Sequence, residues 1–183
     1  MKFTEQDIKG VWLIEPVRYG DARGYFCETF RQDDFDKAVG RHVEFIQDNE
    51  SFSTYGVVRG LHYQQGPYSQ AKLVRVSLGE VLDVAVDLRR SSPTFGRYMA
   101  VVLSADRGNQ LFVPRGFAHG FAVLSETAQF QYKVDNLYHP EAEVSIRYDD
   151  PAIGVDWQIA PEQRLLSPKD LKGISFATAP LFD

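Results

Sequence analysis

The chain has 183 residues, of which 44% are hydrophobic and 25% are charged, a balance typical of a globular protein with a sizeable core. Its net charge of −5 argues against non-specific binding to nucleic acid or to an anionic membrane, so an anionic ligand has to be met by clustered cations. The single cysteine, Cys27, cannot form an internal disulfide and is expected in the core. The N-terminus lacks the apolar core of a signal peptide, and no window is apolar enough to span a bilayer. We therefore expect a soluble cytoplasmic protein.

Short runs of β-branched and aromatic residues recur along the chain, separated by Gly, Pro, Asn and Asp, which is typical of an all-β sandwich or barrel. No repeat or long polar linker divides residues 1–183, so we expect a single domain. The predicted strands, in chain order, are Gly10–Glu15, Gly24–Phe30, Val43–Asp48, Val57–Tyr63, Ala71–Val76, Glu80–Asp87, Tyr98–Ser104, Gln110–Val113, Gly120–Leu124, Ala128–Val134 and Val144–Tyr148.

One helix is predicted over Asp33–Val39, with Asp33 as its N-cap and Gly40 as its end. After Pro151 the pattern weakens, and residues 151–183 are expected to be mostly loops with one short helical turn.

Two of the predicted strands carry a titratable side chain inside an apolar run, His62 and Lys72. Burial disfavours the charged form of both groups, so each needs a partner or a function. Side chains two apart in a strand share a face, which places His62 with Val58 and Lys72 with Val74. The opposite faces are also apolar, and we expect the barrel interior to cover one side and a partner subunit the other.

Arg59 has the opposite strand parity from His62. The two side chains can therefore reach one ligand only if the strand twists or bulges near Gly60.

The familiar signatures of metal and nucleotide chemistry are absent from the sequence. A metal-dependent jelly roll usually offers closely spaced histidines, and no His-x-His pair occurs among His42, His62, His119 and His139. There is also no G-x-G-x-x-G, no phosphate-binding Walker loop and no G-x-S-x-G elbow. Any chemistry is therefore expected from His, Lys, Tyr, Asp and Arg side chains.

Taken singly, each of these residues also has a purely structural interpretation. His62 suits a hydrogen-bonded core histidine, and Tyr132 a core aromatic with a satisfied hydroxyl. Asp170 and Ser167 match a helix capping box. The arginines Arg23 and Arg59 would then be solvated or paired.

Read together, several collinear motifs between about Gly10 and Asp170 resemble the dTDP-4-dehydrorhamnose 3,5-epimerase family. They are GVVRGLHYQ (56–64), QAKLVRV (70–76), GEVLDVAVDLR (79–89), PRGFAHGF (114–121), the segment with Tyr132 and Tyr138, and LSPKD (166–170). The resemblance implies a cupin-type jelly roll that is a homodimer, with an N-terminal strand exchanged between subunits and no metal or other cofactor.

The resemblance also implies an activity, the inversion of C3 and C5 of dTDP-4-dehydro-6-deoxy-D-glucose to give dTDP-4-dehydro-L-rhamnose for rhamnose synthesis. Both carbons flank the C4 ketone, which acidifies their protons. His62 is implied as the base, because an imidazole with an ordinary pKa of ~6.5 is largely neutral at pH 7. Asp170 would orient it, Lys72 would hold the enolate oxygen, and Tyr132 would return the proton.

The family's sugar-nucleotide contacts match Arg23, Glu28, Gln47, Asn49, Arg59, His119, Tyr138, Glu143 and Lys169. Tyr138 is implied as the aromatic that stacks on thymine, and the arginines suit a diphosphate. Two less direct candidates are Phe26 and Asp83, the latter as a partner of Lys72.

Two alternatives remain open at this point. One is a 3- or 5-epimerase that inverts a single carbon, or a keto-isomerase, acting on a related dTDP-4-keto sugar. The other is a sugar-binding cupin without catalysis, which has no need for His62, Lys72, Tyr132 and Asp170 together.

Overall fold

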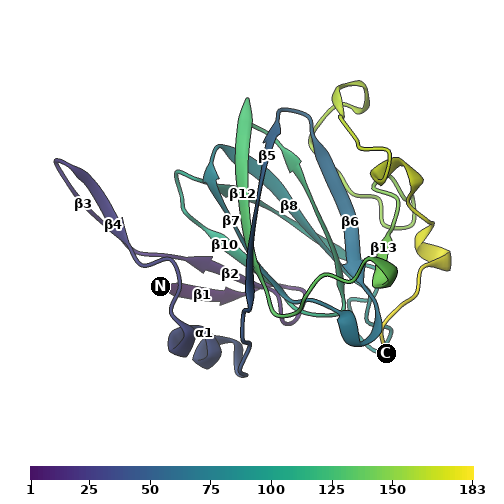
Figure 1. Cartoon of the computed structure of the whole chain (residues 1–183), viewed down its shortest axis with the longest axis horizontal. Helices are drawn as coiled ribbons and strands as arrows, with labels where there is room; N and C mark the ends of the chain where they lie inside the picture. The colour runs from purple at the N-terminus through teal and green to yellow at the C-terminus, as the bar shows by residue number, and fades with distance from the viewer.

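In the computed structural model, which describes residues 1–183, a six-stranded and a five-stranded antiparallel sheet pack against each other (Figure 1). The larger sheet contains, in spatial order, β1 (Lys2–Glu5), β2 (Trp12–Glu15), β10 (Gln110–Val113), β7 (Lys72–Leu78), β12 (Thr127–Val134) and β5 (Gln47–Thr54). The smaller sheet contains β13 (Glu143–Ser145), β6 (Val58–Gln64), β11 (Phe117–Val123), β8 (Glu80–Asp87) and β9 (Tyr98–Ser104). A separate hairpin is formed by β3 (Arg18–Asp21) and β4 (Gly24–Cys27).

The predicted all-β class is confirmed, and β8, β9 and β10 have the predicted bounds. The prediction Val43–Asp48 is wrong, because the strand in this region is β5, Gln47–Thr54. This edge strand reads QDNESFST and lacks the apolar run from which strands are recognised. The short strands β1 and β3 were not predicted.

The helix α1 spans Gln32–Val39, close to the prediction. Gly40 ends it in the left-handed conformation at φ 73°, as expected of a C-terminal glycine. Asp33 is not its N-cap: that position belongs to Arg31, whose side chain makes no capping hydrogen bond. After Pro151 the chain has no regular strand, and three short 3-10 turns cover Pro161–Gln163, Asp170–Lys172 and Phe176–Thr178.

The main core lies between the two sheets. It joins Val74 and Phe130 of the larger sheet to Val81, Ala85 and Phe121 of the smaller one, and Phe121 stacks on Phe130 with ring centroids 4.2 Å apart. Because this core fills part of the space between the sheets, the polar residues of β5, β6 and β12 are left to line the remainder.

The chain itself covers the outer face of the smaller sheet, which corrects the expectation of a partner subunit there, but it covers the outer face of the larger sheet only in part, since Phe52 of β5 is 60% exposed. On the smaller sheet, Leu61 and Tyr63 pack with Ile153, Trp157 and other residues of the C-terminal segment. On the larger sheet, the cover comes from α1 and the segment after it, through Phe35 and Val43.

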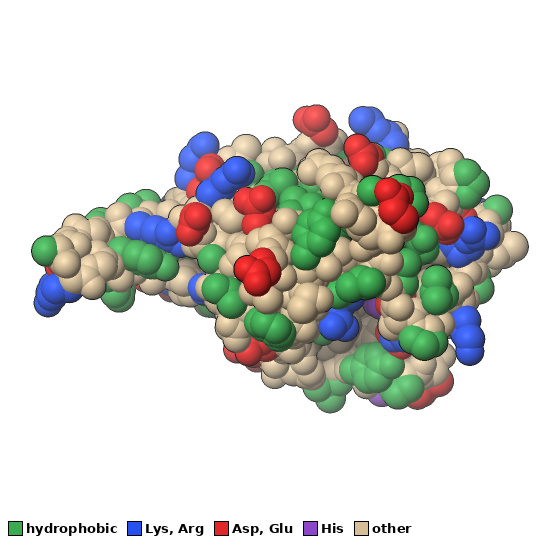
Figure 2. All heavy atoms as spheres, turned by 90° about the horizontal axis from the view of Figure 1, so that it is seen from above, with side chains coloured by type: hydrophobic (Ala, Val, Ile, Leu, Met, Phe, Trp, Pro, Cys, Tyr) green, Lys and Arg blue, Asp and Glu red, His purple; other side chains and the backbone are tan.

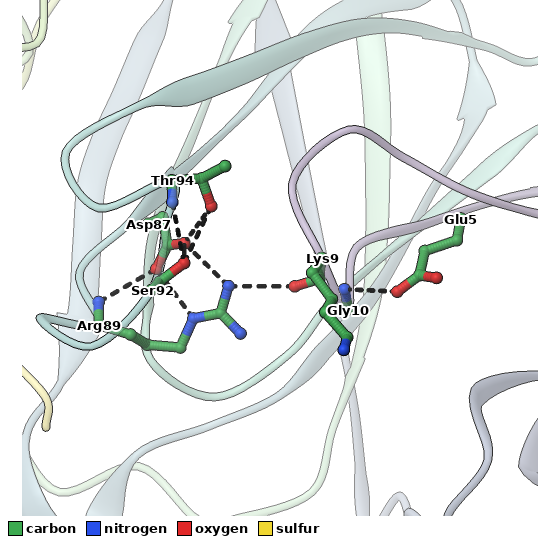
Figure 3. A network of polar contacts seen from close by, with 7 residues as sticks. All are labelled: Glu5, Lys9, Gly10, Asp87, Arg89, Ser92 and Thr94. Atoms are coloured by element: carbon green, nitrogen blue, oxygen red, sulfur yellow. Dashed lines mark hydrogen bonds and ion pairs between the residues drawn. The ribbon is translucent and has the colours of Figure 1, made fainter.

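A buried carboxylate fastens the N-terminal segment to the end of β8 (Figure 3). Asp87 is fully buried and accepts hydrogen bonds from Arg89 Nε at 2.8 Å, Ser92 Oγ at 2.6 Å and Thr94 Oγ1 at 2.7 Å. The Nη2 of Arg89 donates in turn to the carbonyl of Lys9 at 3.0 Å. The network satisfies a charge that would otherwise be costly to bury.

We predict that Trp157→Ala lowers the free energy of unfolding by about 3–5 kcal/mol, because it opens a cavity beneath the smaller sheet. The side chain is fully buried, and its Nε1 donates to the carbonyl of Tyr148 at 2.8 Å. Denaturant unfolding would measure the loss. The control is Leu171→Ala, at a side chain that is 64% exposed, and an equal loss in both variants would contradict the prediction.

Candidate active site

A pocket of about 290 Å³ opens between the sheets, and four residues predicted to act together lie in its wall. These are His62, Lys72, Tyr132 and Asp170. The remaining lining residues are Ser51, Arg59, His119, Gly120, Phe121, Phe130, Glu143, Ser167 and Lys169. The sequence therefore brings its dispersed titratable residues to one place.

The imidazole of His62 lies beside a buried carboxylate. His62 Nε2 is 2.8 Å from Asp170 Oδ1, although its N–H direction is not well aligned with that oxygen. The same oxygen accepts from the backbone N–H of Gly60 at 3.1 Å, and the other oxygen from Ser167 Oγ at 2.5 Å. Burial by itself raises the pKa of Asp170, but these donors outweigh it and hold the pKa at about 2. Asp170 is therefore an anion at neutral pH.

Asp170 makes the contacts that both interpretations require, although the N-cap of its turn is Lys169 and not Ser167. Asp170 exchanges hydrogen bonds with Ser167, as a capping box does, and its other oxygen faces His62.

Lys72 enters the pocket from the first position of β7. Burial lowers its pKa to about 8, against the opposing influence of the negative charges of Asp83 and Glu143. The ammonium form still predominates at pH 7, and no ion pair occupies it. It is thus free to interact with a developing negative charge on a ligand.

Tyr132 lies on β12 of the larger sheet, whereas His62 lies on β6 of the smaller sheet. Two proton-carrying groups therefore stand on opposite walls of one pocket. Burial raises the pKa of Tyr132 above its ordinary value, and the positive charge of Arg59 opposes this rise. The phenol keeps its proton at neutral pH.

Arg59 and His62 can face the same pocket only if β6 is irregular between them, and the structure has such an irregularity at Gly60. The register of β6 against β11 shifts at this point, where Gly60 has a φ of 126°. A side chain at Gly60 would come within 2.6 Å of the Cα of Gly120, so only glycine fits. Arg59 and His62 consequently both line the pocket. The predicted grouping of His62 with Val58 is wrong, because Val58 packs on the outer face with Leu61.

Asp83 pairs with His119 rather than with Lys72, which corrects the predicted pairing. His119 Nε2 lies 3.0 Å from both carboxylate oxygens of Asp83, and both residues are buried. His119 lies on β11 and Asp83 on the neighbouring strand β8. The register partner of Asp83 is Phe121, so His119 reaches Asp83 diagonally across the two strands. Asp83 therefore fixes the ring of His119 and contributes only a through-space charge to Lys72.

Glu143 connects two other predicted ligand contacts, Tyr138 and Lys169. Its carboxylate accepts from Tyr138 Oη at 2.7 Å and from Lys169 Nζ. Tyr138 is 53% exposed, so its ring is open to a stacking partner.

Asn49 of β5 lines a neighbouring groove together with Tyr132, and neither Asn49 nor Gln47 lines the pocket that holds His62. Gln47 Nε2 donates to Asn49 Oδ1 at 2.7 Å, and Asn49 is the register partner of Tyr132. Ser51, which lines the pocket, and Ser53, whose Oγ accepts from Arg59, were missed by the sequence analysis. Continuing the alternation from Gln47 and Asn49 would have found both.

Three further predicted contacts also lie outside this pocket. Glu28 pairs with Arg31 beside α1, and Arg23 and Phe26 lie on the β3–β4 hairpin, hereafter the arm, which projects from the body (Figure 2). The side chain of Arg23 is 90% exposed and pairs with Asp21, while Phe26 is 70% exposed.

No group of three or more His, Cys, Asp or Glu residues is placed to hold a metal ion. No helix in the structure has the length and apolar character needed to cross a membrane.

A family model described as dTDP-4-dehydrorhamnose 3,5-epimerase matches residues 5–178. The chain is 51% identical over 182 residues to the dTDP-4-dehydrorhamnose 3,5-epimerase of Shigella flexneri, covering 100% of this chain and 99% of that relative. The dTDP-6-deoxy-D-glucose-3,5-epimerase of Legionella pneumophila, in complex with dTDP-4-keto-L-rhamnose, has a TM-score of 0.93 and 46% identity, over 98% of this chain and 94% of that chain. A 3'-monoepimerase of Streptomyces bikiniensis, in complex with dTDP-quinovose, has a TM-score of 0.87 and 36% identity, over 95% and 87%.

The fold and the pocket thus define a sugar-nucleotide epimerase scaffold of the jelly-roll class. The chain belongs to the dTDP-4-dehydrorhamnose 3,5-epimerase family, and the resemblance read from its motifs is confirmed.

The lowered pKa of Lys72 predicts a measurable cost in stability. Between its folded pKa of about 8 and the ordinary value of 10.5, the unfolded chain holds a proton that the folded chain has released. Stability contributed by this site therefore rises with pH across that window, and the cost of burying the ammonium is fully present below it.

We predict that Lys72→Met raises the free energy of unfolding at pH 7 by up to about 3 kcal/mol, although it removes a pocket cation. Denaturant titrations at pH 7 and pH 10 would show the gain shrinking at the higher pH. Lys37→Met, on the exposed face of α1, is the control. A destabilised Lys72→Met variant at pH 7 would contradict the prediction.

Proposed function

We propose that the chain catalyses the epimerisation of C3 and C5 of dTDP-4-dehydro-6-deoxy-D-glucose, giving dTDP-4-dehydro-L-rhamnose, in the synthesis of dTDP-L-rhamnose. The observation that carries the proposal is the placement of His62 and Tyr132 on opposite walls, with Lys72 in the same pocket. Inversion of a carbon requires a proton to leave one face and another to arrive on the opposite face. The near-identity in length and the 51% identity to the Shigella flexneri epimerase support the same reaction.

The first half of the reaction is proton removal. The ring nitrogen of His62 that does not face Asp170 takes the proton from C3 or C5, and the C–H electron pair becomes the carbon–carbon double bond of an enolate. The negative charge moves to the C4 oxygen, where the ammonium of Lys72 stabilises it. One such donor typically contributes about 2.7–4 kcal/mol to the transition state. The Asp170 carboxylate stabilises the imidazolium that forms.

The second half is proton return. The hydroxyl of Tyr132 gives its proton to the carbon from the opposite face, the C4 ketone reforms, and the configuration is inverted. His62 then holds one proton more and Tyr132 one fewer, and exchange with water restores both. The chemistry is a proton transfer at each carbon, and the residues in the pocket supply every proton carrier it needs.

A second candidate is inversion of one carbon only. The observation that supports this candidate is the similarity to the 3'-monoepimerase of Streptomyces bikiniensis, at a TM-score of 0.87. The configuration of the product at C3 and C5 separates the two activities directly.

We further propose that the working unit is a homodimer in which the arm crosses to the other subunit. The arm exposes Tyr19 by 66%, Tyr25 by 61% and Phe26 by 70%, more apolar surface than a two-stranded hairpin can sustain alone. Its base is fixed by Arg18, whose guanidinium donates to the carbonyls of Ala105 and Asp106. The first strand, β1, pairs with β2 of its own chain, so the arm is the N-terminal segment that is free to cross.

The dimer also accounts for the predicted ligand contacts that lie outside the pocket. The arm that carries Arg23 and Phe26 projects from the body of its own chain (Figure 1), and we infer that these residues join the pocket of a second copy. An arginine delivered there would meet the diphosphate with a bidentate fork.

We predict that Tyr132→Phe separates proton removal from inversion. The aromatic packing survives while the phenolic proton is lost, so His62 can still exchange the substrate proton on its own face. In D2O the variant should place deuterium in the substrate at C3 or C5 and give little or no inverted product by NMR. His62→Asn should lose exchange at both carbons. Full inversion by Tyr132→Phe at the unchanged rate would show that Tyr132 is only a packing residue.

We predict that two weakened variants restore activity when their subunits are mixed. In a heterodimer of Arg23→Ala and His62→Asn chains, one pocket combines an intact His62 with an intact arm, so up to about a quarter of wild-type activity should return. His62→Asn mixed with Lys72→Met is the control, because both changes lie in the pocket and no intact site can form. A monomer by sedimentation, or equal activity in both mixtures, would contradict the proposed crossing.

A further inference from the structure

The two oxygens of the Asp170 carboxylate have separate partners. Oδ1 faces His62 Nε2 at 2.8 Å and accepts from the N–H of Gly60 at 3.1 Å. Oδ2 accepts from Ser167 Oγ at 2.5 Å, and Ser167 N lies 3.4 Å away. Asp170 is only 4% exposed, so water has little access to compensate for a lost partner.

We propose that Ser167 is a positioning residue for the epimerisation, fixing the rotation of the Asp170 carboxylate so that Oδ1 faces His62. This inference rests on the proposed function, in which Asp170 orients the base. The terminal torsion of an aspartate is broad, and hydrogen bonds rather than rotamer preference therefore decide where its oxygens point. Ser167 supplies the hydroxyl donor to Oδ2.

Removing the hydroxyl would leave Oδ2 buried with only the long contact to the backbone N–H of Ser167. A buried acceptor without a partner is costly, and the carboxylate can relieve that cost by rotating about its terminal torsion or by taking a proton. Rotation moves Oδ1 away from His62, and protonation removes the negative charge that His62 faces. The proposed base would then lose its orientation while Arg59 and Lys169, the cations implied as ligand contacts, stay in place.

The alternative is that Ser167 only stabilises the Asp170–Lys172 turn, since Asp170 N donates to Ser167 Oγ at 3.2 Å. The chain offers a matched serine for comparison. Ser175 caps the next turn, Phe176–Thr178, and its Oγ accepts from Ala177 N at 3.3 Å. Ser175 does not line the pocket, so its removal reports the effect of losing a cap alone.

The test compares Ser167→Ala, Ser167→Thr and Ser175→Ala with the wild-type chain, using dTDP-4-dehydro-6-deoxy-D-glucose in D2O. The measurements are kcat and KM for deuterium incorporation at C3 and C5, together with thermal unfolding. We expect Ser167→Ala to lower kcat roughly tenfold with KM nearly unchanged, in proportion to a hydrogen bond made to a charged group. Ser167→Thr keeps the hydroxyl and should restore kcat, and Ser175→Ala should keep the wild-type kcat.

A Ser167→Ala variant that loses stability as Ser175→Ala does, but keeps its kcat, would overturn the inference. A change in KM alone would overturn it as well. If Ser167→Ala fails to fold, Ser167→Cys takes its place, because cysteine has a similar size and a weaker donor. A kcat of Ser167→Cys equal to the wild-type value would also overturn the inference. If the wild-type chain itself incorporates no deuterium, the proposed epimerisation is wrong. This outcome is distinct from a failure of the proposed role of Ser167, which is measured relative to an active wild-type chain.

Discussion

The active-site architecture depends on the burial of one ionised carboxylate, that of Asp170. A buried anion is tolerated only when partners surround it, and here they are the hydroxyl of Ser167, the backbone N–H of Gly60 and the adjacent imidazole of His62. His62 and Gly60 lie on β6, whereas Asp170 and Ser167 belong to the C-terminal segment, so these contacts hold that segment against the sheet that carries the proposed base. The same contacts that satisfy the charge therefore assemble the site.

The pocket then distributes its remaining groups by sheet. The smaller sheet supplies His62, while the larger sheet supplies Lys72 and Tyr132. A substrate placed between the sheets would meet the imidazole of His62, with the Asp170 carboxylate beside it, on one side. On the other side it would meet the ammonium of Lys72 and the phenol of Tyr132. Burial lowers the pKa of Lys72, so the folded chain holds this ammonium at a cost that a negatively charged ligand group would offset. A purely binding cupin has no use for this combination.

Much of this could be predicted from the sequence, because strand alternation and motif resemblance are local or collinear signals. The bounds of β8, the end of α1 at Gly40 and the meeting of the four proposed catalytic residues all followed from them. Other features depend on long-range packing. The polar edge strand β5 has no apolar signature, and the C-terminal cover around Trp157 carries no regular period, so neither could be placed. Asp83 pairs with His119 and not with Lys72 because β8 lies next to β11 in the sheet. Strand parity does not reveal which strands are neighbours.

The central claim is that the wild-type pocket makes an enolate and inverts both carbons beside the ketone. The most direct measurement is an NMR time course of dTDP-4-dehydro-6-deoxy-D-glucose with the purified chain in D2O. We predict deuterium at both C3 and C5 and a product with the configuration of dTDP-4-dehydro-L-rhamnose. A substrate recovered without deuterium at either carbon would contradict the account, and deuterium confined to one inverted carbon would show that the chain is a single-carbon epimerase.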